Sequence, residues 1–221
     1  MNSKEYWNNK IIEWEDSMHG ASHLSFIERL ASYFRKPVLF RNKTVLETIL
    51  PLVDGKVVLE LGCGSGYFAF DLCKNSKVKK IIGLDISEQA INRAKKLSQE
   101  MGLAYQCEFY RIDAISAQLP AADITVGMGF LDYLTAEEII SLFKNIRSPY
   151  IVFSLTERKF SILRYIHILY LLSQRCPKHF YYTKKEWLGF LAGKFGEINF
   201  IEDKRLSFAC VTHNLPTNPK V

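Results

Sequence analysis

Apolar and polar residues follow two different periods along this chain. Short apolar runs bounded by glycine, proline or charged residues are typical of strands that are buried on both faces. Such runs occupy residues 57–61, 79–86, 105–112, 123–129, 150–155, 198–202 and 206–212. Segments with apolar residues at helical spacing separate most of them. Strands alternating with helices predict an α/β fold, with a mostly parallel sheet, right-handed crossovers and helices on both faces.

Capping residues predict where three of these helices begin. Ser87 has the side chain of an N-cap and precedes a segment that runs to about residue 101. Thr135 with Glu138, and Thr183 with Glu186, each have the spacing of a capping box. The two last apolar runs are separated by 203–205, which predicts a terminal hairpin.

About 56 residues precede the first core strand, and their apolar spacing is helical. An aromatic-rich first helix contains Tyr6, Trp7 and Trp14 and is interrupted near Gly20. A second helix is expected over 26–34 and a third over 41–52. Pro37 is predicted to end the second helix, because proline has no N–H and clashes with the preceding turn.

Residues 160–172 are apolar on nearly every side of the predicted helix. Such a helix must be covered by protein, substrate or a membrane interface. Basic residues surround it: Arg158, Lys159, Arg164, Arg175 and Lys178. Three interpretations therefore remain open, namely a cap over a substrate pocket, part of the core, and peripheral membrane contact.

The first strand runs directly into three glycines at alternate positions, Gly62, Gly64 and Gly66, and a helical segment follows. Without Cβ atoms, a turn of this kind can bring main-chain N–H groups at a helix N-terminus into contact with a ligand. A dinucleotide fingerprint would need glycine at position 67, where this chain has Tyr67. No lysine stands where a phosphate loop requires one.

With Glu60 the pattern becomes Glu-x-Gly-x-Gly-x-Gly, which resembles the first motif of class I S-adenosylmethionine-dependent methyltransferases. Asp85 at the tip of the second strand, Asp113 after the third and the loop after the fourth follow at that family's spacing. The resemblance covers about 43–213. It implies S-adenosylmethionine as cofactor and a Rossmann-like seven-stranded sheet whose last strand is antiparallel.

The resemblance also implies a set of cofactor-binding residues: Glu60, Gly62, Cys63, Gly64, Gly66, Asp85, Ile86, Asp113, Ala114 and Met128. In this set the Asp85 carboxylate would accept hydrogen bonds from the two ribose hydroxyls. Asp113 would hold the adenine amino group. The carbonyls near Met128 would hold the ammonium of the methionine moiety.

Length and composition limit the number of domains, the expected location and the chemistry of the cysteines. The 221 residues predict one methyltransferase domain, with an N-terminal helical lid over 1–52 and a cap insertion over 160–182. No signal peptide or membrane-spanning run is seen, so a cytoplasmic protein is expected. Five cysteines without close pairs indicate neither a disulfide framework nor a metal site. Residues 151–221 hold 11 basic and 5 acidic residues, so the net charge of +6 lies there.

A basic last third and an apolar helix favour a small, anionic and partly apolar acceptor. Oxygen is the expected methylated atom, and nitrogen and carbon remain open. By residue type, His167, His179 and His19 are the candidates for a general base. The segment before the glycine motif distantly resembles magnesium-protoporphyrin methyltransferases, which esterify a carboxylate. Two alternatives are an RNA methyltransferase and a non-catalytic S-adenosylmethionine-binding protein, although no nucleic-acid module or nucleobase-methylation motif is present and nucleic acid is an unlikely partner.

Overall fold

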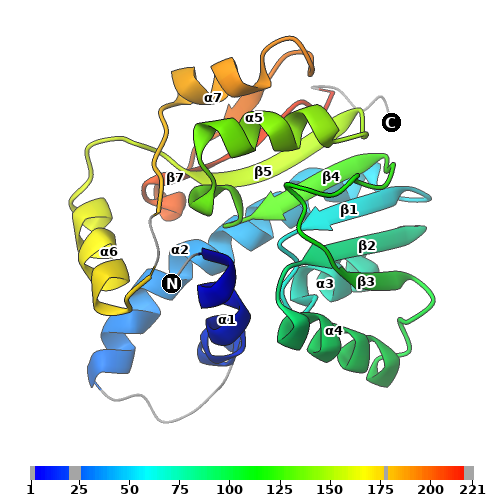
Figure 1. Cartoon of the computed structure of the whole chain (residues 1–221), viewed down its shortest axis with the longest axis horizontal. Coiled ribbons are helices and arrows are strands. Elements are labelled where there is room, and N and C mark those ends of the chain that lie inside the picture. Colours follow the sequence, from blue (N-terminus) through cyan, green and yellow to red (C-terminus); the bar gives the residue numbers. More distant parts are fainter. Residues whose placement is uncertain (1–2, 20–25, 177–178, 217–221) are drawn as a thin grey trace.

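The computed structural model describes residues 3–19, 26–176 and 179–216. Its sheet has the strand order β3-β2-β1-β4-β5-β7-β6 (Figure 1). The strands are β1 (Val57–Leu61), β2 (Lys80–Asp85), β3 (Cys107–Arg111), β4 (Ile124–Met128), β5 (Tyr150–Thr156), β6 (Asn199–Ile201) and β7 (Ala209–His213). The first five are parallel, whereas β7 is antiparallel to both β5 and β6. The predicted seven-stranded sheet with an antiparallel last strand is confirmed.

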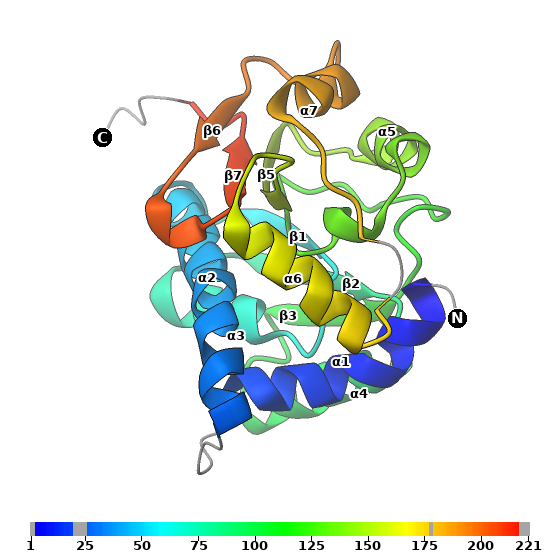
Figure 2. The same ribbon diagram turned by 90° about the vertical axis from the view of Figure 1, so that its left-hand side faces the viewer.

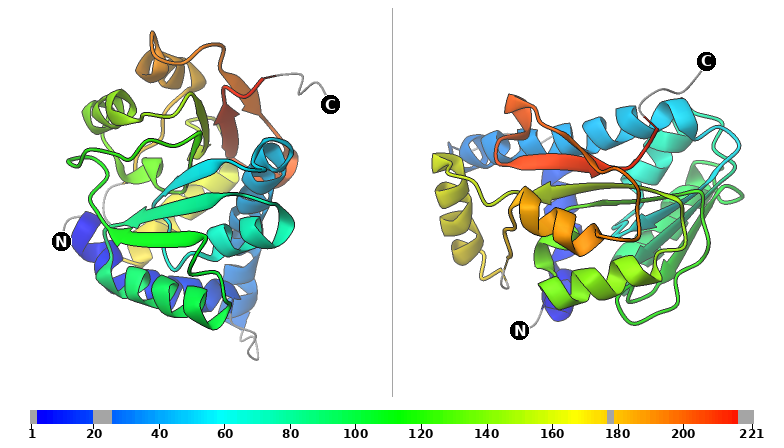
Figure 3. Two further views of the ribbon diagram at one scale, coloured as in Figure 1. Left: turned by 90° about the vertical axis from the view of Figure 1, so that its right-hand side faces the viewer. Right: turned by 90° about the horizontal axis from the view of Figure 1, so that it is seen from above.

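Helices cover both faces of this sheet (Figure 3). One face carries α2 (Phe26–Ile49), α3 (Tyr67–Asn75) and α4 (Glu88–Glu100), and the other carries α5 (Ala136–Asn145) and α7 (Lys184–Leu191). Short 3-10 turns occur at η1 (Leu50–Leu52), η2 (Leu131–Tyr133) and η3 (Lys204–Leu206), the last of which joins β6 to β7. The buried side chains form two clusters, one on each face of the sheet. Among the described residues, positions 3–19 and 157–181 contribute nothing to either cluster. Tyr182 is partly buried and packs against the cluster on the α5 side.

The predicted caps are present. The Ser87 hydroxyl accepts from the backbone N–H of Ala90 and starts α4. Thr135 and Thr183 each form a complete capping box, in which the threonine hydroxyl and the glutamate at the third helical position satisfy each other's backbone N–H groups. These local signals fix where the helices begin, and therefore how the loops leave the sheet.

The prediction that Pro37 ends a helix is wrong, because α2 is one continuous helix that contains this proline. A proline inside a helix costs roughly 3 kcal/mol. The second half of α2 fully buries Val45 and Ile49 against the sheet. Each such side chain contributes about 1.5–3 kcal/mol when it is buried, so packing of the second half outweighs the missing hydrogen bond.

Two helices lie outside the layered core: α1 (Ser3–His19) and α6 (Ile162–Ser173). Together with the first half of α2 they lie around the edge where the parallel strands end (Figure 2). The outer side of α6 is exposed, which excludes the interpretation of 160–172 as plain core. In the described part of the chain, no helix has the length and apolar character needed to cross a bilayer.

Candidate functional site

The three glycines after β1 adopt the conformation for which glycine is needed. Their φ angles are 70° at Gly62, 53° at Gly64 and 82° at Gly66, in the left-handed region that side chains with a Cβ avoid. Gly66 is also the N-cap of α3, and the N–H groups of Gly62 and Cys63 both donate to the Leu84 carbonyl, at 2.8 and 3.1 Å. The glycine turn is therefore anchored to β2 and places the N-terminus of α3 at the carboxyl edge of the sheet.

Asp85, the last residue of β2, is bound to this turn. Its Oδ2 accepts from the Gly64 N–H at 2.9 Å and its Oδ1 from the Ser87 N–H at 2.8 Å. Burial raises the pKa of the Asp85 carboxyl, although these backbone hydrogen bonds act in the opposite direction. Ile86 follows, and its carbonyl accepts from Arg111. The structure thus brings the second motif against the first.

Glu60, the next-to-last residue of β1, lies two residues before Gly62 and is 2% exposed. Within residues 3–19, 26–176 and 179–216, its Oε2 has no hydrogen-bond partner. Burial raises the pKa of the Glu60 carboxyl well above its usual range, and the nearby carboxylates of Asp85 and Glu15 raise it further. A buried carboxyl with an unsatisfied oxygen indicates that a positively charged or hydrogen-donating group is missing at this position.

Glu15 is a site residue that sequence reasoning missed. It lies on α1, is buried, and its Oε1 accepts from the Ser65 N–H at 2.7 Å while Oε2 contacts the Ser65 hydroxyl. A carboxylate at this position faces the N-terminus of α3, where the helix dipole favours negative charge. A Cβ atom on Gly64 would overlap Glu15 Oε1. Burial raises the pKa of the Glu15 carboxyl.

Two further contacts hold α1 beside the glycine turn. Asp16 forms an ion pair with Arg93 of α4 at 2.6 Å, and the Asn8 side chain accepts from the Glu88 N–H at 3.2 Å. Figure 3 shows α1 running alongside α4. α1 therefore lies against both the glycine turn and α4; the N-terminal lid stays a prediction.

The third and fourth motifs lie in loops at the same edge. The Asp113 carboxylate accepts from the Ile115 N–H and the Ser116 hydroxyl at 3.2 and 3.0 Å, so it also closes its own turn. Ala114 beside it is buried, and Met128 ends β4 and is half-buried. The Cys63 thiol is buried within the glycine turn, and burial raises its pKa well above the usual range. This thiol is therefore not a reactive nucleophile at neutral pH.

A second polar cluster, the Asp132 cluster, lies after β4. It consists of Asp132 of η2, Arg41 of α2, His167 of α6, His179 and Tyr181. Oδ1 of Asp132 accepts from the backbone N–H and the hydroxyl of Thr156 at 2.8 and 2.9 Å. Its Oδ2 lies 3.5 Å from Arg41 Nη1 and 3.9 Å from His179 Nε2. A carboxylate, a guanidinium and an imidazole thus meet in one buried place.

The cluster contains two of the three histidines expected as general bases. The rings of His167 and His179 are 5.4 Å apart, and His167 Nδ1 lies 3.0 Å from the Tyr181 hydroxyl. Burial lowers the pKa of His167 to about 4 and also lowers the pKa of His179, with Arg41 acting in the same direction on both. Both imidazoles are therefore neutral at pH 7. The side chain of His19 lies outside the described part of the chain.

Like Glu60, this cluster contains buried polar atoms without a hydrogen-bond partner among the described residues. Among the described residues, His179 Nδ1 and Arg41 Nε have no hydrogen-bond partner, although both are buried. Arg41 also lies beside Gly129, since a Cβ there would be 3.3 Å from its Nη2. The unsatisfied donors and acceptors favour a polar ligand in contact with this cluster.

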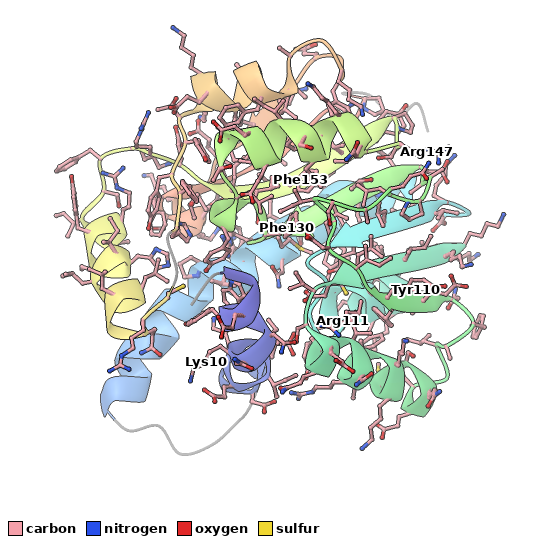
Figure 4. All side chains as sticks on the ribbon, viewed as in Figure 1. Lys10, Tyr110, Arg111, Phe130, Arg147 and Phe153 are labelled. Atoms are coloured by element: carbon pink, nitrogen blue, oxygen red, sulfur yellow. The ribbon has the colours of Figure 1, made fainter. Side chains whose placement is uncertain are left out.

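Aromatic side chains connect the two halves of the site. Phe130, at the centre of Figure 4, packs on the glycine turn, since a Cβ on Gly62 would lie 3.0 Å from its Cβ. The Trp7 ring of α1 lies 5.1 Å from the Tyr133 ring, which in turn lies 5.2 Å from His179. The region between the glycine turn and the Asp132 cluster is thus bordered by apolar rings as well as polar groups.

Comparisons with known proteins show which proteins this chain is similar to. A family model described as "Methyltransferase domain" matches residues 52–189, more than half of the chain. A ribosomal protein L11 methyltransferase of Enterobacter sp. (strain 638) is 34% identical over 79 residues, which is 34% of this chain and 27% of that protein. Methyltransferase phqN of Penicillium fellutanum is 34% identical over 71 residues, or 32% and 22% of the two chains. The matched segment thus spans about a quarter of these relatives' length.

A solved structure with a similar fold is magnesium protoporphyrin IX methyltransferase (ChlM) from Synechocystis PCC 6803 with bound SAH. It has a TM-score of 0.73, is 16% identical, and the similarity covers 95% of this chain and 96% of that one. At this level of identity the likeness shows the fold. It extends over the sheet and over almost all of the remaining chain.

Proposed function

Because this chain belongs to the methyltransferase domain family, whose class I enzymes use S-adenosylmethionine, we propose that it delivers the methyl group to an oxygen atom of a small, acidic and partly apolar molecule. The observation that supports this acceptor is the buried Asp132 cluster. It offers a cation and neutral imidazoles together, next to the glycine turn.

The residues around the glycine turn fit the cofactor. Glu60 Oε2 is buried without a hydrogen-bond partner among the described residues, and it could accept from the ammonium of S-adenosylmethionine. The cofactor when bound supplies an electrophilic methyl group on a sulfonium. In our proposal Asp85 holds the ribose hydroxyls beside Ile86. Glu60 and the Met128 carbonyl hold the ammonium, and Asp113 with Ala114 holds the adenine.

The glycines let the backbone approach the cofactor. A Cβ on Gly66 would lie 2.7 Å from Phe109, and one on Gly64 would overlap Glu15. Protein atoms thus lie within or close to the place that a Cβ would take at Gly62, Gly64 and Gly66. In our proposal the main-chain atoms of Gly62, Cys63, Gly64 and Gly66 contact the methionine moiety.

The Asp132 cluster can bind and activate an acceptor. Arg41, 11% exposed, can pair with a carboxylate of the acceptor through the Nε that lacks a partner among the described residues. His179 is neutral and has an unsatisfied nitrogen, so it can take the proton of a hydroxyl acceptor. Asp132, 3.9 Å away, would then stabilise the imidazolium. A carboxylate acceptor would need only the alignment that Arg41 gives.

The aromatic rings favour a partly apolar acceptor. The Trp7 ring of α1 packs against Tyr133, which packs against His179 of the Asp132 cluster. Because the Arg41 side chain is only 11% exposed, the local dielectric constant is low, and this strengthens its interaction with an anionic acceptor. A free nucleic acid strand would instead need a continuous basic groove, and it would bind with a steep dependence on salt.

The test begins with radiolabelled S-adenosylmethionine and the small-molecule fraction of a cell extract. We expect a labelled small molecule, whose purified precursor then serves in steady-state kinetics. Arg41→Met should raise the KM for this acceptor about tenfold or more without changing cofactor affinity. His179→Gln should lower kcat roughly a hundredfold if the acceptor is a hydroxyl.

Matched controls are available elsewhere in the chain. Arg147 is an exposed arginine at the far side of the molecule (Figure 4), and His213 in β7 is a half-buried histidine. Arg147→Met and His213→Gln should leave both constants unchanged. A labelled protein or RNA without any labelled small molecule would contradict the proposed acceptor.

A further inference from the structure

The outer face of α6 carries a continuous apolar stripe, here called the α6 stripe. It consists of Phe160, Ile162, Tyr165, Ile166, Leu169 and Leu172, whose side chains are between 39% and 85% exposed. Their spacing of three or four residues places the helical members on one side of α6. A monomeric protein rarely exposes six large apolar side chains in a row, so the stripe indicates a binding surface.

The other side of α6 already has its partners. His167 contacts Tyr181 through a hydrogen bond and lies 5.2 Å from the Phe208 ring, and Arg164 lies over the Tyr181 ring. The helix is thus fixed on the molecule by this inner face. α6 itself lies at the left-hand edge of the molecule in Figure 1, and the residues of the stripe are exposed there.

In the sequence segment 158–185, which contains the stripe, aspartate and glutamate are absent and seven residues are basic: Arg158, Lys159, Arg164, Arg175, Lys178, Lys184 and Lys185. Three of these pair with acids outside the segment: Arg158 with Glu186, Lys159 with Glu157 and Lys184 with Glu202. The segment keeps an excess of basic residues over these three acids. Arg175, at the end of α6, is exposed. A surface that is both apolar and basic complements an anionic lipid bilayer.

We propose that the α6 stripe docks the protein on the surface of an anionic membrane. The stripe enters the boundary between headgroups and acyl chains, and the basic residues at its two ends contact the lipid phosphates. The charge pattern disfavours a second copy of this chain as occupant, because two stripes face to face would bring like charges together. The inference goes beyond the proposed methyl transfer and does not depend on it.

The test uses the full chain and vesicle co-sedimentation without cofactor or acceptor. Vesicles of phosphatidylcholine mixed with phosphatidylglycerol should bind the protein, and vesicles of phosphatidylcholine alone should bind it much more weakly. The double substitution Ile162→Glu with Leu169→Glu should abolish binding. Arg175→Gln should lower the partition coefficient about fivefold on anionic vesicles only, since each basic residue near the surface contributes by electrostatics.

Exposed apolar residues outside the α6 stripe serve as matched controls. Tyr105 and Leu188 are also exposed apolar residues, on the β3 side of the sheet and on α7. Tyr105→Glu and Leu188→Glu should bind vesicles like the wild type. Cofactor affinity, measured by calorimetry, should be equal in all these variants, which shows that the stripe variants are folded.

Two results would overturn the inference. One is that the wild type does not bind anionic vesicles, or binds them in a way that the α6 stripe variants do not reduce. The other is a concentration-dependent dimer, seen by sedimentation without vesicles and lost in the Ile162→Glu, Leu169→Glu variant, which would make a second copy the occupant. Failure of vesicle binding would leave the methyl-transfer assay unaffected, so the two proposals are tested separately.

Discussion

At the scale of single residues, the glycine turn is crowded by three carboxyl groups, and burial raises the pKa of each. Glu60, Asp85 and Glu15 lie on β1, β2 and α1, so the negative charge comes from three separate elements. Such a group of carboxylates destabilises the protein on its own and attracts a cationic ligand. If the cofactor binds here as proposed, stability without ligand and cofactor affinity are opposed at this position.

Glu60→Gln should separate the two effects. Gln has the same shape without the charge, so the free energy of unfolding without cofactor should increase at neutral pH. The affinity for S-adenosylmethionine should fall more than about tenfold, since a charge-assisted hydrogen bond is lost. Chemical denaturation and calorimetry measure the two quantities, and a variant that binds the cofactor as well as the wild type would contradict the role proposed for Glu60.

The pH dependence has a definite sign. Because the folded pKa of Glu60 lies above the value of 4.5 expected in the unfolded chain, the native state binds this proton more tightly. The associated stability is present below pH 4.5 and is lost as the pH rises through the folded pKa. Between pH 5 and 8, the free energy of unfolding should therefore decrease more in the wild type than in Glu60→Gln. The difference between their pH slopes should correspond to about one titrating group.

Glu15→Ala should loosen α1. The substitution removes both contacts to Ser65, so the amides of α1 should exchange hydrogen faster while those of α3 keep their protection. Glu13→Ala is the matched control, since Glu13 is exposed on the same helix and pairs only locally with Lys10. Equal exchange in the two variants would show that Glu15 does not hold the helix.

At the scale of elements, the sequence predicts those features that depend on neighbours in the chain. The apolar runs and the capping residues Ser87, Thr135 and Thr183 act locally, and the strands and helices they predict are present. The effect of Pro37 could not be predicted from its neighbours in the chain. α2 continues past this proline because Val45 and Ile49 pack against the sheet, and the strands of that sheet are far away in the sequence.

Pro37→Ala tests this explanation. If packing holds α2 together in spite of the proline, removal of the proline should increase the free energy of unfolding by roughly 1–3 kcal/mol. Thermal or urea denaturation measures the change. A destabilised variant would mean that the helix needs the geometry that proline imposes at this position.

The residues of the candidate site also differ in whether a local sequence pattern identifies them. The glycine motif and Asp85 are recognisable because their spacing is local, and the structure brings them together. Arg41 and Glu15 each lie on a helix among many other charged residues, without a local pattern that distinguishes them. Asp132 and Tyr133 had one usable signal, their position directly after the fourth strand. Only the fold shows that Arg41 and His179 meet Asp132.

At the scale of the whole molecule, the glycine turn, Asp113 and the Asp132 cluster all lie at the carboxyl edge of the parallel strands, where ligands of open α/β sheets bind. α1 spans this edge, since Asp16 contacts α4 at one end and Trp7 contacts Tyr133 at the other. A ligand bound at the edge would thus be enclosed by elements from both halves of the chain.

Hydrogen exchange with and without S-adenosylhomocysteine tests this arrangement. Protection should increase in α1, in the glycine turn and in 113–117, and should stay unchanged at the opposite edge, as at 54–56 and 121–123. At about 100 times its Kd the ligand should stabilise the fold by about 2.7 kcal/mol. Protection confined to the opposite edge would contradict the location of the site.

Within the described residues, the two buried clusters contain no residue of α1 or α6, although Trp7 of α1 contacts Tyr133 and His167 of α6 belongs to the Asp132 cluster. Substitutions on these helices should therefore change the stability of the sheet only slightly. In evolutionary terms, the acceptor range of such a protein can drift while the fold stays above its stability threshold. A library that randomises the acceptor-facing positions of α1 and α6 should accordingly yield many folded variants with altered substrate preference.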